Sequence, residues 1–174
     1  IKKNNIDAIY EKKKIDDKNI KNVISEVKSN NIQGINVTVP FKKSVISYMD
    51  QLTPEAENTQ SVNTIYLNDG KIIGHNTDIA GFELSIKKIK YDIAGKRVLI
   101  LGAGGVVSSI IFALYRMKAA KIIISNRTKE KAKNLKNLFK DLLIVDWGYL
   151  SDFDMIINAT SIGLNKEDKI DLDF

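Results

Sequence analysis

Three polar side chains, Lys42, Asn63 and Asp78, stand where short apolar segments of this sequence give way to turns or helices. Strand ends are where α/β folds place their sites, so these residues are candidates for chemistry. Lys42 follows a predicted strand at 34–39 that Pro40 stops, and we expect it in the first turn of a helix. The positive end of the helix dipole favours loss of its proton there, which suits a proton-transfer catalyst. The alternative is a surface lysine in a lysine-rich protein.

The other two candidates also have simpler interpretations. Asp78 precedes a helical pattern, so a helix N-terminus would stabilise its anion, and plain N-capping is the alternative. For Asn63 the alternative is a turn or strand-edge amide. His75, the single histidine, has no second metal ligand nearby in the sequence, so we interpret it as structural and predict no metal site.

A glycine-rich turn at 102–105 lies between a predicted strand at 97–101 and a predicted helix at 106–117. Backbone N–H groups of such a turn can approach a pyrophosphate at the helix N-terminus, so the pattern predicts a dinucleotide site. The third small residue of this fingerprint falls at Val107, which is bulky. The residues expected to hold the cofactor here are Gly102, Ala103, Gly104, Gly105 and Val106.

The end of the next predicted strand, 121–125, indicates which dinucleotide is bound. An NAD-specific site would carry an acid there to hold the ribose hydroxyls, but this chain has Asn126, Arg127 and Thr128. Arg127 would attract a 2′-phosphate and stack on adenine, and Lys131 would add a second positive charge. We therefore predict NADP over NAD. The alternative is an ordinary helix start with Thr128 as its N-cap.

The elements that must position these residues follow from hydrophobic spacing. In the first half the expected elements are a helix from about 17 to 29, a helical turn at 53–55, a hairpin at 61–75 and a helix at 79–89. In the second half, strands at 97–101, 121–125, 142–145 and 155–158 alternate with helices. This order predicts an α/β fold with a doubly wound parallel sheet in the second half.

Composition narrows the class of protein. The 174 residues are 44% hydrophobic, enough for one good core or two small ones, and no apolar run is long enough to span a membrane. The net charge is +6, but only three of the 27 basic residues are arginine and the lysines are scattered, so we predict no nucleic-acid partner. The lack of cysteine excludes disulfides and suits a reducing, cytoplasmic location.

Six short motifs are distributed from about Ile6 to the C-terminus. They are Gly34-x-Asn-Val-Thr-x-Pro-Phe-Lys42, Val62-Asn-Thr64, Gly74-x-Asn-Thr-Asp78-x-x-Gly81-Phe82, Gly102-x-Gly-Gly105, Asn126-Arg-Thr128 and Asn158-Ala-Thr-Ser161. In this order and with these gaps they closely resemble the shikimate dehydrogenase family. The resemblance implies an NADP-dependent oxidoreductase that reversibly reduces 3-dehydroshikimate to shikimate, in the chorismate pathway to aromatic amino acids.

The resemblance also implies roles and domains. Residues 1–90 would form an α/β substrate domain with a mixed sheet, and residues 91–174 a Rossmann-type NADP-binding domain. Lys42 would donate a proton to the developing oxyanion or stabilise it, and Asp78 would hold Lys42 and a substrate hydroxyl. The residues expected on the ring hydroxyls are Thr38, Asn63 and Asn76, and those expected beside the nicotinamide are Thr160 and Ser161.

Some features depart from the family pattern. The chain opens at Ile1 rather than Met, and we expect a fragment. The family's carboxylate-binding serines would precede Ile1, and residues completing the nicotinamide pocket would follow Phe174. We therefore expect this segment alone to bind shikimate poorly. Gln60-Ser61 and Val106-Val107 also stand where smaller residues are usual.

Four alternative functions stay open. A quinate/shikimate dehydrogenase that prefers NAD would want an acid near 126–127, and a related reductase of one-carbon metabolism is disfavoured by the stretch 76–78. A non-catalytic dinucleotide sensor has no need of Lys42 and Asp78, and a nucleic-acid module is disfavoured by the scattered lysines. Composition leaves the oligomeric state open, with a homodimer as one possibility.

Overall fold

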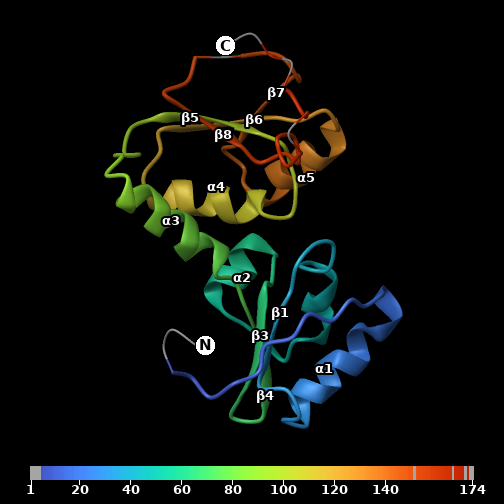
Figure 1. Cartoon of the computed structure of the whole chain (residues 1–174). Helices are drawn as coiled ribbons and strands as arrows, with labels where there is room; N and C mark the ends of the chain where they lie inside the picture. Colours follow the sequence, from blue (N-terminus) through green and yellow to red (C-terminus); the bar gives the residue numbers. More distant parts are fainter. Residues whose placement is uncertain (1–4, 151, 166, 171, 173–174) are drawn as a thin grey trace.

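The computed structural model describes residues 5–150, 152–165, 167–170 and 172. Two four-stranded sheets follow one another along the chain, each accompanied by helices (Figure 1). This arrangement confirms the predicted α/β class, with a mixed sheet first and a parallel sheet second. Within the described ranges, no helix combines the length and the apolar character needed to cross a membrane.

The first sheet has the strand order β1-β3-β4-β2. Its centre is the hairpin of β3 (Thr64–Asn68) and β4 (Lys71–His75), closed by Asp69 and Gly70, which both have positive φ as tight hairpin turns require. β1 (Gly34–Asn36) runs antiparallel to β3, and β2 (Gln51–Leu52) runs parallel to β4.

Helices border this sheet as the spacing predicts. The 3-10 helix η2 (Asp17–Asn19) leads into α1 (Ile20–Lys28), whose buried apolar side chains share a core with those of β3 and β4. α2 (Pro54–Thr59) begins where the Thr53 hydroxyl accepts from the Ala56 N–H. α3 (Asp78–Lys88) starts directly after β4 and packs against α4 of the second half (Figure 1).

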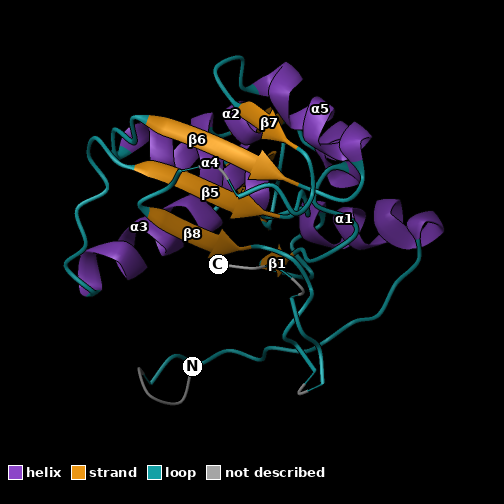
Figure 2. Ribbon diagram, turned by 90° about the horizontal axis from the view of Figure 1, so that it is seen from above, coloured by secondary structure: helices purple, strands orange, loops and turns teal. Residues whose placement is uncertain are grey.

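The second sheet is parallel throughout, in the order β7-β6-β5-β8. Figure 2 shows these strands pointing the same way. Its elements are β5 (Arg97–Leu101), α4 (Val107–Arg116), β6 (Lys121–Ser125), α5 (Lys129–Leu138), β7 (Leu143–Val145) and β8 (Met155–Asn158). Four consecutive residues of β5 and four of β6 are buried, the pattern of parallel strands covered on both faces.

The register of this sheet brings three chain segments to one edge. Leu101 pairs with Ser125 on one side and with Asn158 on the other. The segments that follow, beginning at Gly102, Asn126 and Ala159, therefore leave the sheet side by side. This is the edge where doubly wound folds bind ligands.

The structure corrects the expectation for Lys42. The strand predicted at 34–39 ends at Asn36, and residues 39–43 form turns before the 3-10 helix η3 (Ser44–Tyr48), so Lys42 is not in the first turn of an α-helix. The Lys42 carbonyl accepts from the Val62 N–H at 2.8 Å instead of from a later residue of its own helix. The helix-dipole argument for Lys42 therefore fails.

An exposed ion pair joins the starts of β5 and β8. Asp154 Oδ2 accepts from the Arg97 backbone N–H at 2.8 Å and from Arg97 Nε at 3.2 Å, and Oδ1 accepts from Nη2 at 3.1 Å. Hydrogen bonds from the Arg97 side chain and backbone lower the pKa of Asp154 to about 2.

A pH dependence of stability follows from this pair. A depressed carboxylate pKa contributes stability that is present above the unfolded-state pKa of about 4 and is lost as pH falls through the folded-state value. We expect Asp154→Asn to lower the melting temperature by a constant amount from pH 7 to 5. The difference from wild type should then shrink towards pH 2. Thermal unfolding followed by circular dichroism tests this, and a difference that persists unchanged to pH 2 would contradict it.

Candidate functional site

Lys42 and Asp78, 36 residues apart in the sequence, meet in the structure. Lys42 Nζ lies 2.7 Å from Asp78 Oδ2. Their side chains are 14% and 23% exposed, so the pair is partly shielded from water and still reachable by a small molecule. Partial burial strengthens the attraction between the two charges relative to an exposed surface pair. The arrangement offers an ammonium held in place by a carboxylate.

Asp78 is not an N-capping residue. The N-cap of α3 is Thr77, whose side chain makes no capping bond, and Asp78 is the first helical residue. Its Oδ2 accepts from Lys42 and its Oδ1 accepts from Asn63 Nδ2 at 2.8 Å. Both carboxylate oxygens therefore contact other segments of the chain.

Asn63 fixes the start of α3. The residue is 8% exposed, and its Oδ1 accepts from the Thr77 N–H at 3.0 Å while Nδ2 donates to Asp78. These hydrogen bonds explain why a polar side chain is tolerated at the end of a buried segment, because a buried amide needs hydrogen-bond partners. The amide is used within the protein, so the geometry supports a role in orienting Asp78.

Asn76 does not lie where the substrate prediction requires. It is 1% exposed, its Oδ1 accepts from the Asp78 N–H at 2.9 Å, and its Nδ2 donates to three acceptors in the protein. The turn that joins Asn76 to Asp78 directs the short side chain inwards, so contact with ring hydroxyls is excluded in this arrangement. Thr38, in contrast, is exposed beside the turn that carries Lys42, so its expected substrate contact stays a prediction.

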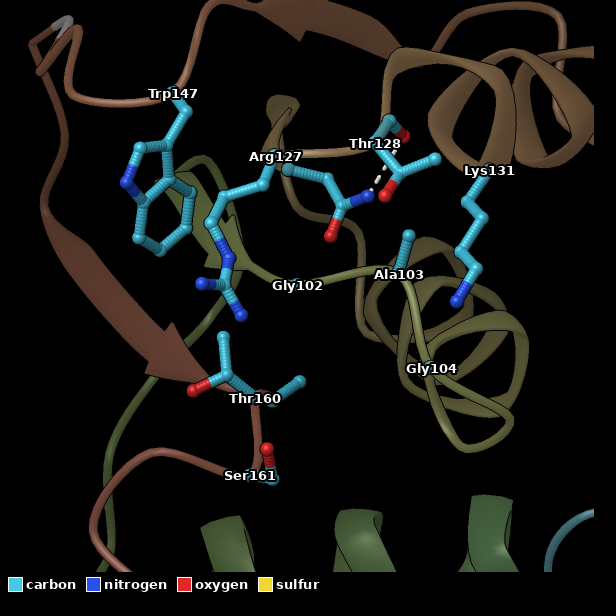
Figure 3. A pocket seen from close by; sticks show the side chains of 11 residues that line it. Gly102, Ala103, Gly104, Arg127, Thr128, Lys131, Trp147, Thr160 and Ser161 are labelled. Atoms are coloured by element: carbon cyan, nitrogen blue, oxygen red, sulfur yellow. Dashed lines mark hydrogen bonds between the residues drawn. The ribbon is translucent and has the colours of Figure 1, made fainter. Parts of the chain in front are cut away.

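A cavity of about 280 Å³ opens at the carboxyl edge of the second sheet (Figure 3). Nine of the residues predicted to hold the cofactor line it, whereas Gly105 and Val106 do not. The lining residues are Gly102, Ala103, Gly104, Asn126, Arg127, Thr128, Lys131, Trp147, Ala159, Thr160 and Ser161.

The glycine turn has the geometry that a phosphate site needs. Gly102 has φ +103°, and a Cβ there would lie 2.8 Å from the Ala159 carbonyl oxygen, so only glycine fits. Within the described part of the chain, the backbone N–H groups of Gly104 and Gly105 donate to no protein acceptor. Val107, the bulky departure from the fingerprint, is fully buried in the core. The turn thus offers free donors at the start of α4.

Two cations flank this cavity. Figure 3 shows Arg127 beside Trp147 and Lys131 near Ala103 and Gly104. Neither cation forms an ion pair with any residue that the structure describes, whereas nearby Lys129 contacts Asp146 at 2.6 Å. Free cations around unused N–H groups fit a ligand that carries several phosphates.

Internal hydrogen bonds stabilise two of the strand-end loops that line this cavity. Asn126 Nδ2 donates to the Thr128 carbonyl at 2.7 Å, and Thr128 occupies the N-cap position of α5 without a side-chain capping bond. Asn158 Oδ1 accepts from Thr160 Oγ1 at 2.7 Å, and Thr160 Oγ1 accepts from the Ile162 N–H. The exposed Ser161 follows in the same loop.

Trp147 and Ala159 line the cavity but were not predicted. Trp147 is the only tryptophan of the chain and follows the edge strand β7 by two residues. Its position just past the carboxyl end of a parallel strand was a usable signal.

The Lys42 turn approaches the glycine turn of the second half. A Cβ placed on Gly105 would lie 3.6 Å from Val39 Cγ1, and Asn76 Nδ2 donates to Ser109 Oγ in α4 at 2.9 Å. The ammonium–carboxylate pair is thus carried by segments that contact the start of α4.

Two family models and a curated relative match the sequence of this chain. Residues 1–65 match the model of the shikimate dehydrogenase substrate binding domain, and residues 83–165 match that of shikimate / quinate 5-dehydrogenase. The shikimate dehydrogenase (NADP(+)) of Pelagibacter ubique is 53% identical over 174 residues, which are 100% of this chain and 66% of the relative.

Solved structures show the same arrangement. A shikimate dehydrogenase from Aquifex aeolicus is 37% identical with a TM-score of 0.80, over 90% of this chain and 59% of that one. A shikimate 5-dehydrogenase from Thermus thermophilus, in complex with NADP(H) and shikimate, is 29% identical with a TM-score of 0.77, over 86% and 56%. The chain thus spans between 56% and 66% of the length of these relatives.

Proposed function

Because this chain belongs to the shikimate dehydrogenase family, we propose that it carries the catalytic pair and the dinucleotide site of an NADP-dependent enzyme that interconverts 3-dehydroshikimate and shikimate. The observation that carries the proposal is the 2.7 Å contact between Lys42 and Asp78, on segments that touch the start of α4. A pure dinucleotide-binding protein has no need of such a pair.

We assign substrate binding to the half of the chain with the first sheet and cofactor binding to the half with the second. Residues 1–90 bind the substrate, with Thr38 contacting a ring hydroxyl, and residues 91–174 bind NADP. The N–H groups of Gly104 and Gly105 would bind the pyrophosphate, and Arg127 and Lys131 would bind the 2′-phosphate. The loop at 160–161 would contact the nicotinamide.

The mechanism assigns each step at the carbonyl to a residue of this chain. When bound, NADPH would supply the hydride for the C3 carbonyl carbon. Lys42 Nζ stabilises the negative charge on the carbonyl oxygen and donates the proton that completes the hydroxyl. Asp78 Oδ2 holds the ammonium towards that oxygen, and Asn63 holds Asp78 through Oδ1. Acid–base assistance of this kind is typically worth roughly 10²–10⁴-fold in rate.

Shikimate-dependent reduction of NADP⁺ by the full-length protein tests the proposal directly. We expect turnover with shikimate and NADP⁺, with quinate and NAD⁺ as comparison substrate and cofactor. No turnover with shikimate would overturn the proposal. The same assay on residues 1–174 tests whether this segment alone is impaired, and equal rates would refute that expectation.

Trp147 provides a binding signal that does not depend on turnover. We expect NADP⁺ to quench the fluorescence of this single tryptophan, because Trp147 lines the cavity proposed for the dinucleotide, near Arg127. Trp147→Ala should weaken NADP⁺ binding roughly 2- to 10-fold, the range of one lost aromatic contact. Trp147→Phe should keep most of the affinity. Fluorescence that NADP⁺ leaves unchanged would contradict binding of the dinucleotide in this cavity.

The predicted cytoplasmic location and the homodimer stay part of the proposal. Cell fractionation and light scattering after size-exclusion chromatography test them.

A further inference from the structure

Asn76 occupies the junction between the two halves of the chain. It follows β4 of the first sheet, and its Nδ2 donates to Ser109 Oγ in the first turn of α4 at 2.9 Å. The same nitrogen lies 3.1 Å from Thr59 Oγ1 and 2.9 Å from the Ser61 carbonyl. One buried amide thus contacts the end of α2, the loop before β3 and the helix that follows the glycine turn.

The orientation of this amide is determined by its partners. The Asp78 N–H can only donate, so the atom that faces it at 2.9 Å is the oxygen Oδ1. The Ser61 carbonyl can only accept, so the atom that faces it is the nitrogen. Thr59 Oγ1 donates its own hydrogen to the Glu55 carbonyl at 2.7 Å, which leaves its lone pairs for Asn76. Nδ2 carries two hydrogens for three acceptors, so at least one of its hydrogens is shared between two of them.

The junction links the catalytic carboxylate to the cofactor helix through two bonds of one side chain. Oδ1 fixes the backbone of Asp78, whose carboxylate holds Lys42, and Nδ2 fixes α4, which begins just past the glycine turn. Asn76, Thr59 and Ser109 are all almost completely buried, so water cannot readily replace a lost bond.

We infer that Asn76 is a positioning residue that holds Asp78 and α4 in a fixed relation, so that the Lys42–Asp78 pair faces the nicotinamide end of the cofactor. This inference rests on the proposed function. The dinucleotide cavity is lined only by residues of the second half, from 102 to 161. Loss of the junction should therefore leave NADP⁺ affinity intact and lower the rate of hydride transfer.

Kinetics of the full-length protein test the inference. Asn76→Ala should lower kcat roughly 10- to 100-fold, because a small misplacement of reacting groups slows the chemical step by about that factor. The Kd for NADP⁺ should stay within about 2-fold of wild type. Ser109→Ala should lower kcat roughly 2- to 10-fold, the range of one buried hydrogen bond, and the double variant should be no worse than Asn76→Ala. The matched control is Ser108→Ala, whose hydroxyl lies in the same helix turn and does not contact Asn76; it should keep the wild-type kcat.

A second measurement is independent of activity. The chain contains no cysteine, so Lys28→Cys in α1 and Lys133→Cys in α5 can carry spin labels on the two halves. We expect a narrow distance distribution in the otherwise unchanged protein and a broader one with Asn76→Ala. An unchanged distribution, or a loss of kcat no larger than that of Ser108→Ala, overturns the inference. If the unchanged protein does not turn over shikimate, the proposed function fails and the distance distribution alone decides the role of Asn76.

Discussion

Replacing Lys42 with alanine is expected to lower turnover of shikimate by roughly 10²–10⁴-fold, the range of lost acid–base assistance. The Lys42 ammonium is the cation that Asp78 holds at 2.7 Å, and the variant leaves the Asp78 carboxylate without it. The lining of the dinucleotide cavity does not include Lys42, so NADP⁺ should bind with unchanged affinity. Steady-state kinetics together with Trp147 fluorescence measure the two effects separately.

The neighbouring lysine provides the control. Lys43 is exposed and one residue further along the same turn, so Lys43→Ala removes an equal charge without touching Asp78. Its kcat should stay within about 2-fold of wild type, because scattered surface charges contribute little. Equal losses of kcat in the two variants would show that turnover depends on the surface charge and not on the position of Lys42.

The second large effect concerns the choice of cofactor. Arg127→Ala is expected to raise the KM for NADP⁺ roughly 10- to 100-fold, since a charge-assisted hydrogen bond is worth about 1.5–3 kcal/mol. The KM for NAD⁺, which lacks the 2′-phosphate, should change far less. The ratio of kcat/KM for the two cofactors is therefore the measurement, and a parallel loss with both would contradict a phosphate contact.

A lysine on the same helix controls for general electrostatics. Lys133 lies in α5 two residues after Lys131, is exposed and does not line the cavity. Lys133→Ala should leave the cofactor ratio unchanged, whereas Lys131→Ala should shift it in the same direction as Arg127→Ala. Salt screens long-range attraction between charges. The change in the cofactor ratio caused by Arg127→Ala should therefore persist at moderate ionic strength, whereas a change caused only by long-range attraction should shrink.

The division between the two sheets was predictable because it depends on local pattern. Near-continuous runs of Val, Ile and Leu mark strands buried on both faces, and the parallel sheet follows from their alternation with helices. The hairpin at Asn68-Asp69-Gly70 was predictable for the same reason, because adjacent residues supply the positive φ angles that a tight turn needs.

The direction of single side chains was less predictable. Asn76 was expected to face the substrate and instead faces the interior, because its partners Thr59, Ser61 and Ser109 come from three other parts of the chain. Lys42 was expected in a helix and instead lies in a turn, because its carbonyl pairs with Val62, twenty residues away. Trp147 follows the carboxyl end of β7, but that it lines the cavity depends on loops from distant parts of the chain.

The amino-acid sequence by itself determined the order of strands and helices in the second half, the glycine at position 102 and the cations that follow β6, since each depends on residues adjacent along the chain. It did not predict the two-residue strand β2. Only the tertiary structure decided that Lys42 contacts Asp78 and that Asn76 joins α3 to α4. Those contacts depend on hydrogen bonds between segments far apart in sequence, and no local spacing specifies which way a side chain at a strand end will turn.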